Sequence, residues 1–109
     1  MDFNKSVIER SKTTPVVVQF TALWCGYCKP MKAMIGSQSV ARGDFEFYLA
    51  DVDADKDLVK TYGIRGIPKV VLFKNGSVVS HFVSGASPQA FTNWLNQFIQ
   101  KKEAEKSAS

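Results

Sequence analysis

The two cysteines of this chain, Cys25 and Cys28, are separated by two residues. The sequence contains no others, so neither has another thiol with which to build a framework of structural disulfides. In such a pair the second sulfur reaches back to the first around one helical turn. The spacing therefore predicts thiol–disulfide exchange, in which a thiolate at Cys25 attacks a substrate disulfide and Cys28 then displaces the reduced product.

A metal site is the main alternative for this cysteine spacing. A structural zinc ion takes four ligands, whereas the sequence offers two cysteines and one histidine, His81, on a different predicted strand. Such a site would have to be shared between two chains, so we expect no metal and a surface position for His81. Residues 51–55 (DVDAD) begin like a calcium loop, but Lys56 stands where glycine is needed and Tyr62 where glutamate is needed.

The cysteine pair lies between a predicted strand and a predicted helix. Residues 16–20 (VVVQF) form a β-branched run typical of a buried central strand. A loop at residues 24–28 turns into a helix that is expected to end near residue 40. The first cysteine then lies where unpaired backbone N–H groups and the helix dipole favour a negative charge. Such a position favours the thiolate, which is the reactive form of a cysteine.

The elements on either side of this unit are predicted from caps and apolar spacing. Residues 3–11 indicate a short helix with Asp2 as its N-cap. Residues 45–49 (FEFYL) form a second strand. A further short helix is expected to begin at a capping Asp55 and to end at Gly63.

The second half of the chain predicts a hairpin followed by a helix. Strands at residues 69–73 and 77–83 are joined by Asn-Gly at residues 75–76, the dipeptide that a type I′ turn requires. Ser87 caps the last helix and Pro88 occupies its first position, where the missing N–H is harmless. The apolar residues of this helix recur with helical spacing and form one stripe: Phe91, Trp94, Leu95, Phe98 and Ile99.

These elements define an α/β fold in the order α-β-α-β-α-β-β-α. The first two strands are joined through a helix and should be parallel with a right-handed crossover, while the hairpin adds an antiparallel pair. We expect a mixed four-stranded sheet with helices on both faces. Residues 1–100 are predicted to form one domain, and residues 101–109, which carry no large apolar side chain, a frayed tail.

Composition narrows the classes of function. The chain has 109 residues and a formal net charge of +4, with basic residues scattered among acidic ones except at residues 101–102. This pattern favours a solvated surface over a nucleic-acid site. The sequence has neither a long apolar run nor a signal-peptide pattern at its N-terminus. We expect no membrane partner, a monomer, and a cytoplasmic location, or a periplasmic or other one if a leader has been removed.

Three motifs together resemble the thioredoxin family. They are WCGYCK at residues 24–29, YGIRGIP at 62–68 and LFKNG at 72–76. The resemblance runs from about residue 3 to 99 and implies a thioredoxin fold that lacks the family's first strand. It implies Cys25 as nucleophile and Cys28 as resolving thiol, with no cofactor beyond their redox-active disulfide. The residues expected to tune this pair are Trp24, Gly26, Tyr27, Lys29 and Gln19.

The resemblance also implies how partners bind. Pro68 is expected to be a cis-proline opposite the cysteines, and the backbone of Ile67 to pair with an extended substrate segment. The expected partners are proteins with disulfides and an electron donor similar to thioredoxin reductase. A shallow apolar docking surface is predicted from Trp24, Gly66, Ile67, Pro68, Ser84, Gly85 and Ala86.

Several positions depart from the family's pattern. Tyr27 stands between the cysteines where thioredoxins usually have proline, and a Gly-Tyr pair there is similar to bacterial disulfide isomerases. Gln19 replaces a buried aspartate and Leu49 its lysine partner. Because glutamine does not titrate, Cys28 is predicted to lose its proton through water or through Cys25. Gln19 is then either a hydrogen-bonded core amide or a residue that orients water.

The helix after the cysteines also differs from the family's. Ala33 occupies the position of a family proline that kinks this helix, and a proline appears earlier, at Pro30. Proline has no N–H and clashes with a helical carbonyl four residues before it. Regular helix is therefore predicted to begin only near Cys28 and to run straighter beyond it.

Three functions are consistent with these residues. The first is reduction of protein disulfides, with the cysteines recharged by a reductase. The second is disulfide isomerisation or oxidation, which Tyr27 and the lost aspartate–lysine pair favour. The third is a binding module whose cysteines are incidental or bind metal. The presence of both cysteines, Trp24 and the expected cis-proline argues against this third hypothesis.

Overall fold

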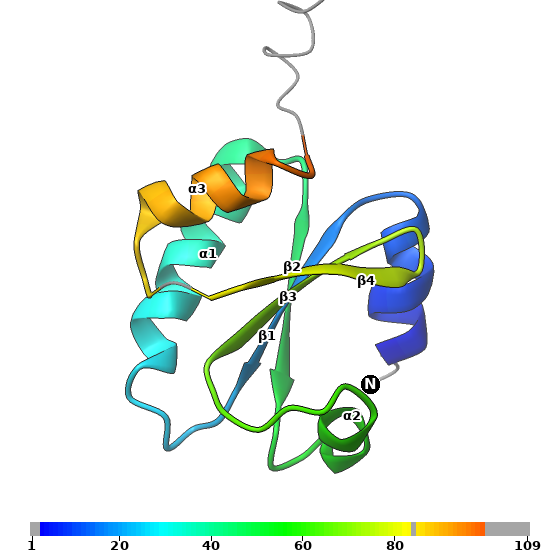
Figure 1. Ribbon diagram of the computed structural model, residues 1–109, viewed down its shortest axis with the longest axis vertical. Coiled ribbons are helices and arrows are strands. Elements are labelled where there is room, and N and C mark those ends of the chain that lie inside the picture. The colour runs from blue at the N-terminus through cyan, green and yellow to red at the C-terminus, as the bar shows by residue number, and fades with distance from the viewer. Residues whose placement is uncertain (1–2, 84, 100–109) are drawn as a thin grey trace, which may run out of the picture.

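A computed structural model describes residues 3–83 and 85–99, and its described part contains one four-stranded sheet in the order β2-β1-β3-β4 (Figure 1). Strand β1 (Val16–Thr21) pairs in parallel with β2 (Glu46–Asp51). On its other side β1 pairs antiparallel with β3 (Lys69–Lys74), which in turn pairs antiparallel with β4 (Ser77–Phe82). The predicted mixed sheet is confirmed, whereas the predicted tail at 101–109 lies outside the described residues.

Helices cover both faces of this sheet (Figure 1). Helices α1 (Cys28–Arg42) and α3 (Pro88–Asn96) pack on one face. The opposite face is covered by the N-terminal segment η1 (Asn4–Glu9), which has wide π-type turns, and by α2 (Lys56–Thr61). Within the described residues, no helix combines the length and apolar character needed to cross a bilayer.

The two faces explain the apolar run of β1. Side chains alternate along a strand, so Val17 joins the core beneath α1 and α3. Val16, Val18 and Phe20 join the core beneath η1 and α2. A strand buried on both faces carries a near-continuous apolar sequence. The exception is Gln19, which is fully buried in the middle of β1.

The predicted turn between β3 and β4 is confirmed, and it is hydrogen-bonded to Ser11 in the N-terminal helical segment. Asn75 and Gly76 have φ of 55° and 83°, as a type I′ turn requires. The helical segment η2 (Arg10–Lys12) lies beside them. The hydroxyl of Ser11 accepts the Gly76 N–H at 2.9 Å, and its carbonyl accepts the Asn75 N–H at 2.8 Å. The predicted cap of the first helix, Asp2, lies outside the described residues.

The helix ends are mostly as predicted, with two corrections. Helix α3 ends at Asn96, before Phe98 and Ile99, which were predicted to lie on it. The Ser87 hydroxyl accepts the Ala90 N–H at 3.2 Å, which confirms the cap of α3. Gly63 has φ of 61° beyond the end of α2. The predicted side-chain cap of α2 is wrong: Asp55 precedes the helix, but its carboxylate makes no capping bond. Its backbone carbonyl instead accepts the N–H groups of the first turn, including that of Leu58 at 3.1 Å.

Helix α1 begins at Cys28, as predicted from Pro30. Pro30 lies in the first turn, where backbone N–H groups have no partner within the helix, so its missing donor costs nothing. The helix ends at Arg42, followed by Gly43 with φ of 70°. This helix thus carries one cysteine at its first position, next to the end of the central strand.

Candidate active site

Cys25 and Cys28 are joined by a disulfide, with their Cα atoms 5.4 Å apart. Cys25 lies in the turn that follows β1, where its N–H donates to the Ala22 carbonyl at 3.1 Å. Cys28 is the first residue of α1 and is 2% exposed, against 5% for Cys25. The two thiols are therefore close enough for the predicted exchange. Their disulfide packs against apolar side chains of Ala22, Val52 and Ile67.

Trp24 is held beside the disulfide by a side chain from another loop. Its indole Nε1–H donates to Oδ2 of Asp53 at 2.8 Å, although 69% of the residue is exposed. The Asp53 N–H in turn donates to Oδ1 of Asp51 at 2.8 Å. Sequence reasoning did not identify Asp53 as a site residue. The two partners lie far apart in the chain, and no local spacing indicates such a contact.

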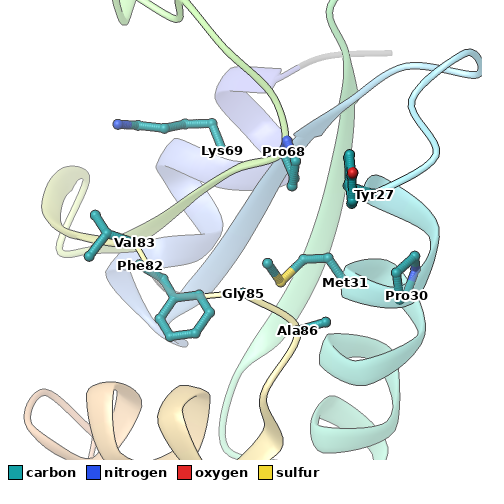
Figure 2. Close-up of a pocket in the computed structure, with 9 residues that line it drawn as sticks. All are labelled: Tyr27, Pro30, Met31, Pro68, Lys69, Phe82, Val83, Gly85 and Ala86. Atoms are coloured by element: carbon teal, nitrogen blue, oxygen red, sulfur yellow. The ribbon is translucent and has the colours of Figure 1, made fainter.

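A groove of about 500 Å³ opens beside Tyr27 (Figure 2). Figure 2 shows the side chains of Met31 and Phe82 reaching into the space between α1 and the end of β4. Tyr27 itself is 84% exposed. We call this space the tyrosine groove; its lining residues are Tyr27, Pro30, Met31, Pro68, Lys69, Phe82, Val83, Gly85 and Ala86.

A second groove, of about 330 Å³, opens beside Trp24. We call it the tryptophan groove; it is lined by Trp24, Val52, Val59, Ile64, Arg65, Gly66 and Ile67. The peptide bond between Ile67 and Pro68 is cis, and these two residues line different grooves.

The predicted docking residues are therefore divided between the tryptophan groove and the tyrosine groove. Trp24, Gly66 and Ile67 line the tryptophan groove. The tyrosine groove contains the other three that the structure describes: Pro68, Gly85 and Ala86. Ser84 lies outside the described residues. The apolar linings contributed by α1, β4 and α2 were missed, because their side chains follow ordinary core spacing in the sequence.

Gln19 lies next to the backbone of Cys28 and is 0% exposed. Its Nε2 donates to the backbone carbonyl of Cys28 at 3.0 Å. Its Oε1 is the one buried side-chain nitrogen or oxygen in the described residues that has no hydrogen-bond partner. Leu49 pairs with Gln19 across β1 and β2, so a neutral amide and an aliphatic side chain occupy these two strand positions.

The other predicted tuning residues are exposed around the disulfide. Gly26 and Lys29 both lie at the surface, on either side of Tyr27 and Cys28. A side-chain carbon added at Gly26 would meet no atom within 4 Å. This position therefore leaves open space next to the disulfide.

His81 lies on the exposed side of β4, as predicted. Partial burial and the positive charge of Lys69 lower the pKa of the His81 imidazole. In residues 3–83 and 85–99, no three side chains of the His, Cys, Asp or Glu types are placed to hold a metal ion.

Comparison with known proteins adds to this geometry. Residues 1–97 match the family description Thioredoxin. A thioredoxin of Rickettsia felis is 33% identical over 98 residues, which are 89% of this chain and 91% of that protein. The protein disulfide-isomerase of Oryctolagus cuniculus is 37% identical over 89 residues, or 75% of this chain and 17% of that protein. The crystal structure of Fasciola hepatica thioredoxin superposes with a TM-score of 0.77 at 25% identity, covering 87% of this chain and 90% of its own.

Proposed function

Because this chain belongs to the thioredoxin family of thiol–disulfide oxidoreductases, we propose that it works as a reductant of protein disulfides. The observation that carries this proposal is the Cys25–Cys28 pair, bonded at the end of the central strand with a groove on either side. The similarity to a thioredoxin along most of both chains supports the reducing direction.

The exchange proceeds in two displacements. The thiolate of Cys25 attacks one sulfur of a substrate disulfide, forms a mixed disulfide and releases the first substrate sulfur as a thiolate. Cys28 then gives up its proton and attacks the sulfur of Cys25, which releases the second substrate sulfur. The substrate has gained two electrons, and the chain is left with the Cys25–Cys28 disulfide. Cys28, buried at the first position of α1, is suited to this second step.

Substrates bind, in this proposal, as extended segments across the disulfide. The backbone of Ile67 pairs with the segment as an added strand would. The tryptophan and tyrosine grooves accept apolar side chains on either side of it. The partners are unfolded or flexible proteins with accessible disulfides, together with an electron donor similar to thioredoxin reductase. We propose no cofactor, because the cysteine pair itself carries the two electrons.

A second candidate is disulfide isomerisation or oxidation. Tyr27 stands between the cysteines and is largely exposed, so in this proposal it contacts a substrate that docks at the disulfide. The likeness to one segment of a protein disulfide-isomerase also favours it. In this superfamily the reduction potential distinguishes the two roles: about −270 mV for thioredoxin and about −180 mV for protein disulfide isomerase.

The equilibrium of the Cys25–Cys28 pair with glutathione separates the candidates. A potential near that of thioredoxin, together with rapid reduction of insulin by catalytic amounts of the protein, is the expected result. A potential near that of the isomerase, with repair of scrambled disulfides but slow insulin reduction, would contradict the proposed direction. The Cys25→Ser variant serves as the inactive control in both assays.

A further inference from the structure

The side-chain carbonyl of Gln19 is a buried acceptor without a donor. The amide is oriented by its other end, because Nε2 donates to the Cys28 carbonyl at 3.0 Å. Oε1 is therefore held close to the first turn of α1, and it is buried with no partner in the disulfide state. A buried polar atom left unpaired destabilises the state in which it occurs. The oxidised form of this chain carries that cost.

Reduction of the disulfide creates the complementary group. When the S–S bond breaks, Cys28 takes up a proton and becomes a buried S–H donor at the residue that Gln19 already contacts. The apolar side chains packed on the cysteines belong to Ala22, Val52 and Ile67, and none of the three carries a polar atom. The acceptor that is unpaired in the disulfide state is therefore near the donor that reduction creates.

We propose that Gln19 is a positioning residue that stabilises the dithiol state. Its Oε1 accepts a hydrogen bond from the Cys28 thiol. The bond holds the proton on Cys28 and leaves the negative charge on Cys25, the attacking sulfur. The inference rests on the redox cycle of the cysteine pair, and it holds whether that pair works as a reductant or as an isomerase.

The consequence is a shift of the redox equilibrium from the disulfide form toward the dithiol form. In exchange with glutathione, the disulfide takes two electrons from two glutathione thiols, which become glutathione disulfide. Of the two protons that the glutathione thiols lose, the chain keeps one on Cys28, and the other goes to Cys25 or to solvent. Because Gln19 stabilises that product, it makes the pair more oxidising than the same pair without the acceptor. Since an amide does not titrate, this contribution is the same at every pH at which Cys28 holds its proton.

The test is the glutathione equilibrium constant of the Gln19→Met variant. Methionine has a similar length but lacks the amide oxygen, so reduction of the disulfide is expected to become about 5- to 30-fold less favourable, the size of one hydrogen bond and its unpaired partner. Val17→Ala is the matched control, since Val17 is buried on the same face of β1. It should lower stability and leave the equilibrium constant within about twofold, because no hydrogen bond to the cysteines is lost.

Three results would overturn the proposal: an unchanged constant in Gln19→Met, a shift in the opposite direction, or an equal shift in Val17→Ala. The absolute potential of the unmodified chain decides between reductant and isomerase, whereas only the difference between variants tests Gln19. Should Gln19→Met fail to fold, infrared spectroscopy of Cys25→Ser gives the answer. Its single S–H stretch, from Cys28, is expected at the lowered frequency of a hydrogen-bonded thiol, and a free-thiol frequency would contradict the proposal.

Discussion

Individual polar contacts control the surroundings of the two sulfurs. On the exposed side, the carboxylate of Asp53 fixes the indole of Trp24. On the buried side, Gln19 fixes the backbone of Cys28. Both partners come from a different part of the chain, and neither contact follows from periodicity or from a local motif. The cysteines and Trp24 could be predicted from their types and spacing, and Gln19 from the family resemblance, but Asp53 could not.

Removing the carboxylate of Asp53 should slow substrate reduction more than it lowers stability. In Asp53→Ala the indole of Trp24 loses its acceptor and its fixed place at the edge of the tryptophan groove. An exposed hydrogen bond contributes about 1 kcal/mol or less to folding, so the measurements are the insulin-reduction rate and the free energy of unfolding. Asp57→Ala, at an exposed carboxylate in the first turn of α2, is the control. Equal rates in the two variants would contradict this role of Asp53.

Protonation of His81 should weaken the fold as the pH falls below 6.5. The pKa of His81 is lowered from 6.5 by partial burial and by the charge of Lys69. Between 6.5 and that lower value the unfolded chain binds more protons than the folded chain, so stability decreases as the pH falls through this window. Above 6.5 both states are neutral and the effect disappears.

The measurement is urea unfolding across this pH range. His81→Gln should make the decrease in stability shallower, and Lys69→Met should do so in part, because the charge of Lys69 is the second of the two causes. Since His81 is mostly exposed, the change is expected to be small. A slope as steep in His81→Gln as in the unmodified chain would assign the acid sensitivity to other groups.

Among the secondary-structure elements, the features that depend on a few neighbouring residues were predicted correctly from those residues. The Asn-Gly turn, the Ser87 cap and the two-faced strand β1 each depend on a few neighbouring residues. The failed cap at Asp55 shows the limit of such signals. The residue type is favourable, but the backbone carbonyl of Asp55 makes the bonds to the first turn of α2 and its carboxylate makes none of them.

A contact between two helices that the sequence did not reveal involves Arg42 at the end of α1. Its guanidinium, with the side chain 3% exposed, donates to Asp44 at 2.9 Å and to Oδ1 of Asn96, the last residue of α3, at 2.7 Å. It also donates to the carbonyl of Ile99 at 3.4 Å. This cluster joins α1, the helix that carries Cys28, to α3.

Breaking this cluster should destabilise the protein strongly. Arg42→Met leaves the carboxylate of Asp44 largely buried without its partner, which should cost about 3 kcal/mol in the free energy of unfolding. Arg10→Met is the matched control, because Arg10 pairs with Glu46 at the exposed surface, where a pair contributes about 1 kcal/mol or less. Urea denaturation compares them, and equal losses would mean that the Arg42 pair is no stronger than a surface one.

Across the whole molecule, the strand order and the helices on both faces bring the end of β1, the start of α1 and the turn before β3 together at one end of the sheet. The order of elements and the three sequence motifs were enough to predict this arrangement. The division of the docking surface into two grooves was not predictable, because it depends on side chains such as Met31 and Phe82, which belong to the buried core and also line the tyrosine groove.

The most direct test of the account is to trap the mixed disulfide. In Cys28→Ser the second displacement is impossible, so incubation with a protein disulfide should leave a stable adduct of one substrate per chain, which mass spectrometry locates on Cys25. The account predicts this adduct and predicts its disappearance when a small dithiol is added. Stable capture by Cys28 in a Cys25→Ser chain, with none by Cys25, would contradict the assignment of the attacking sulfur.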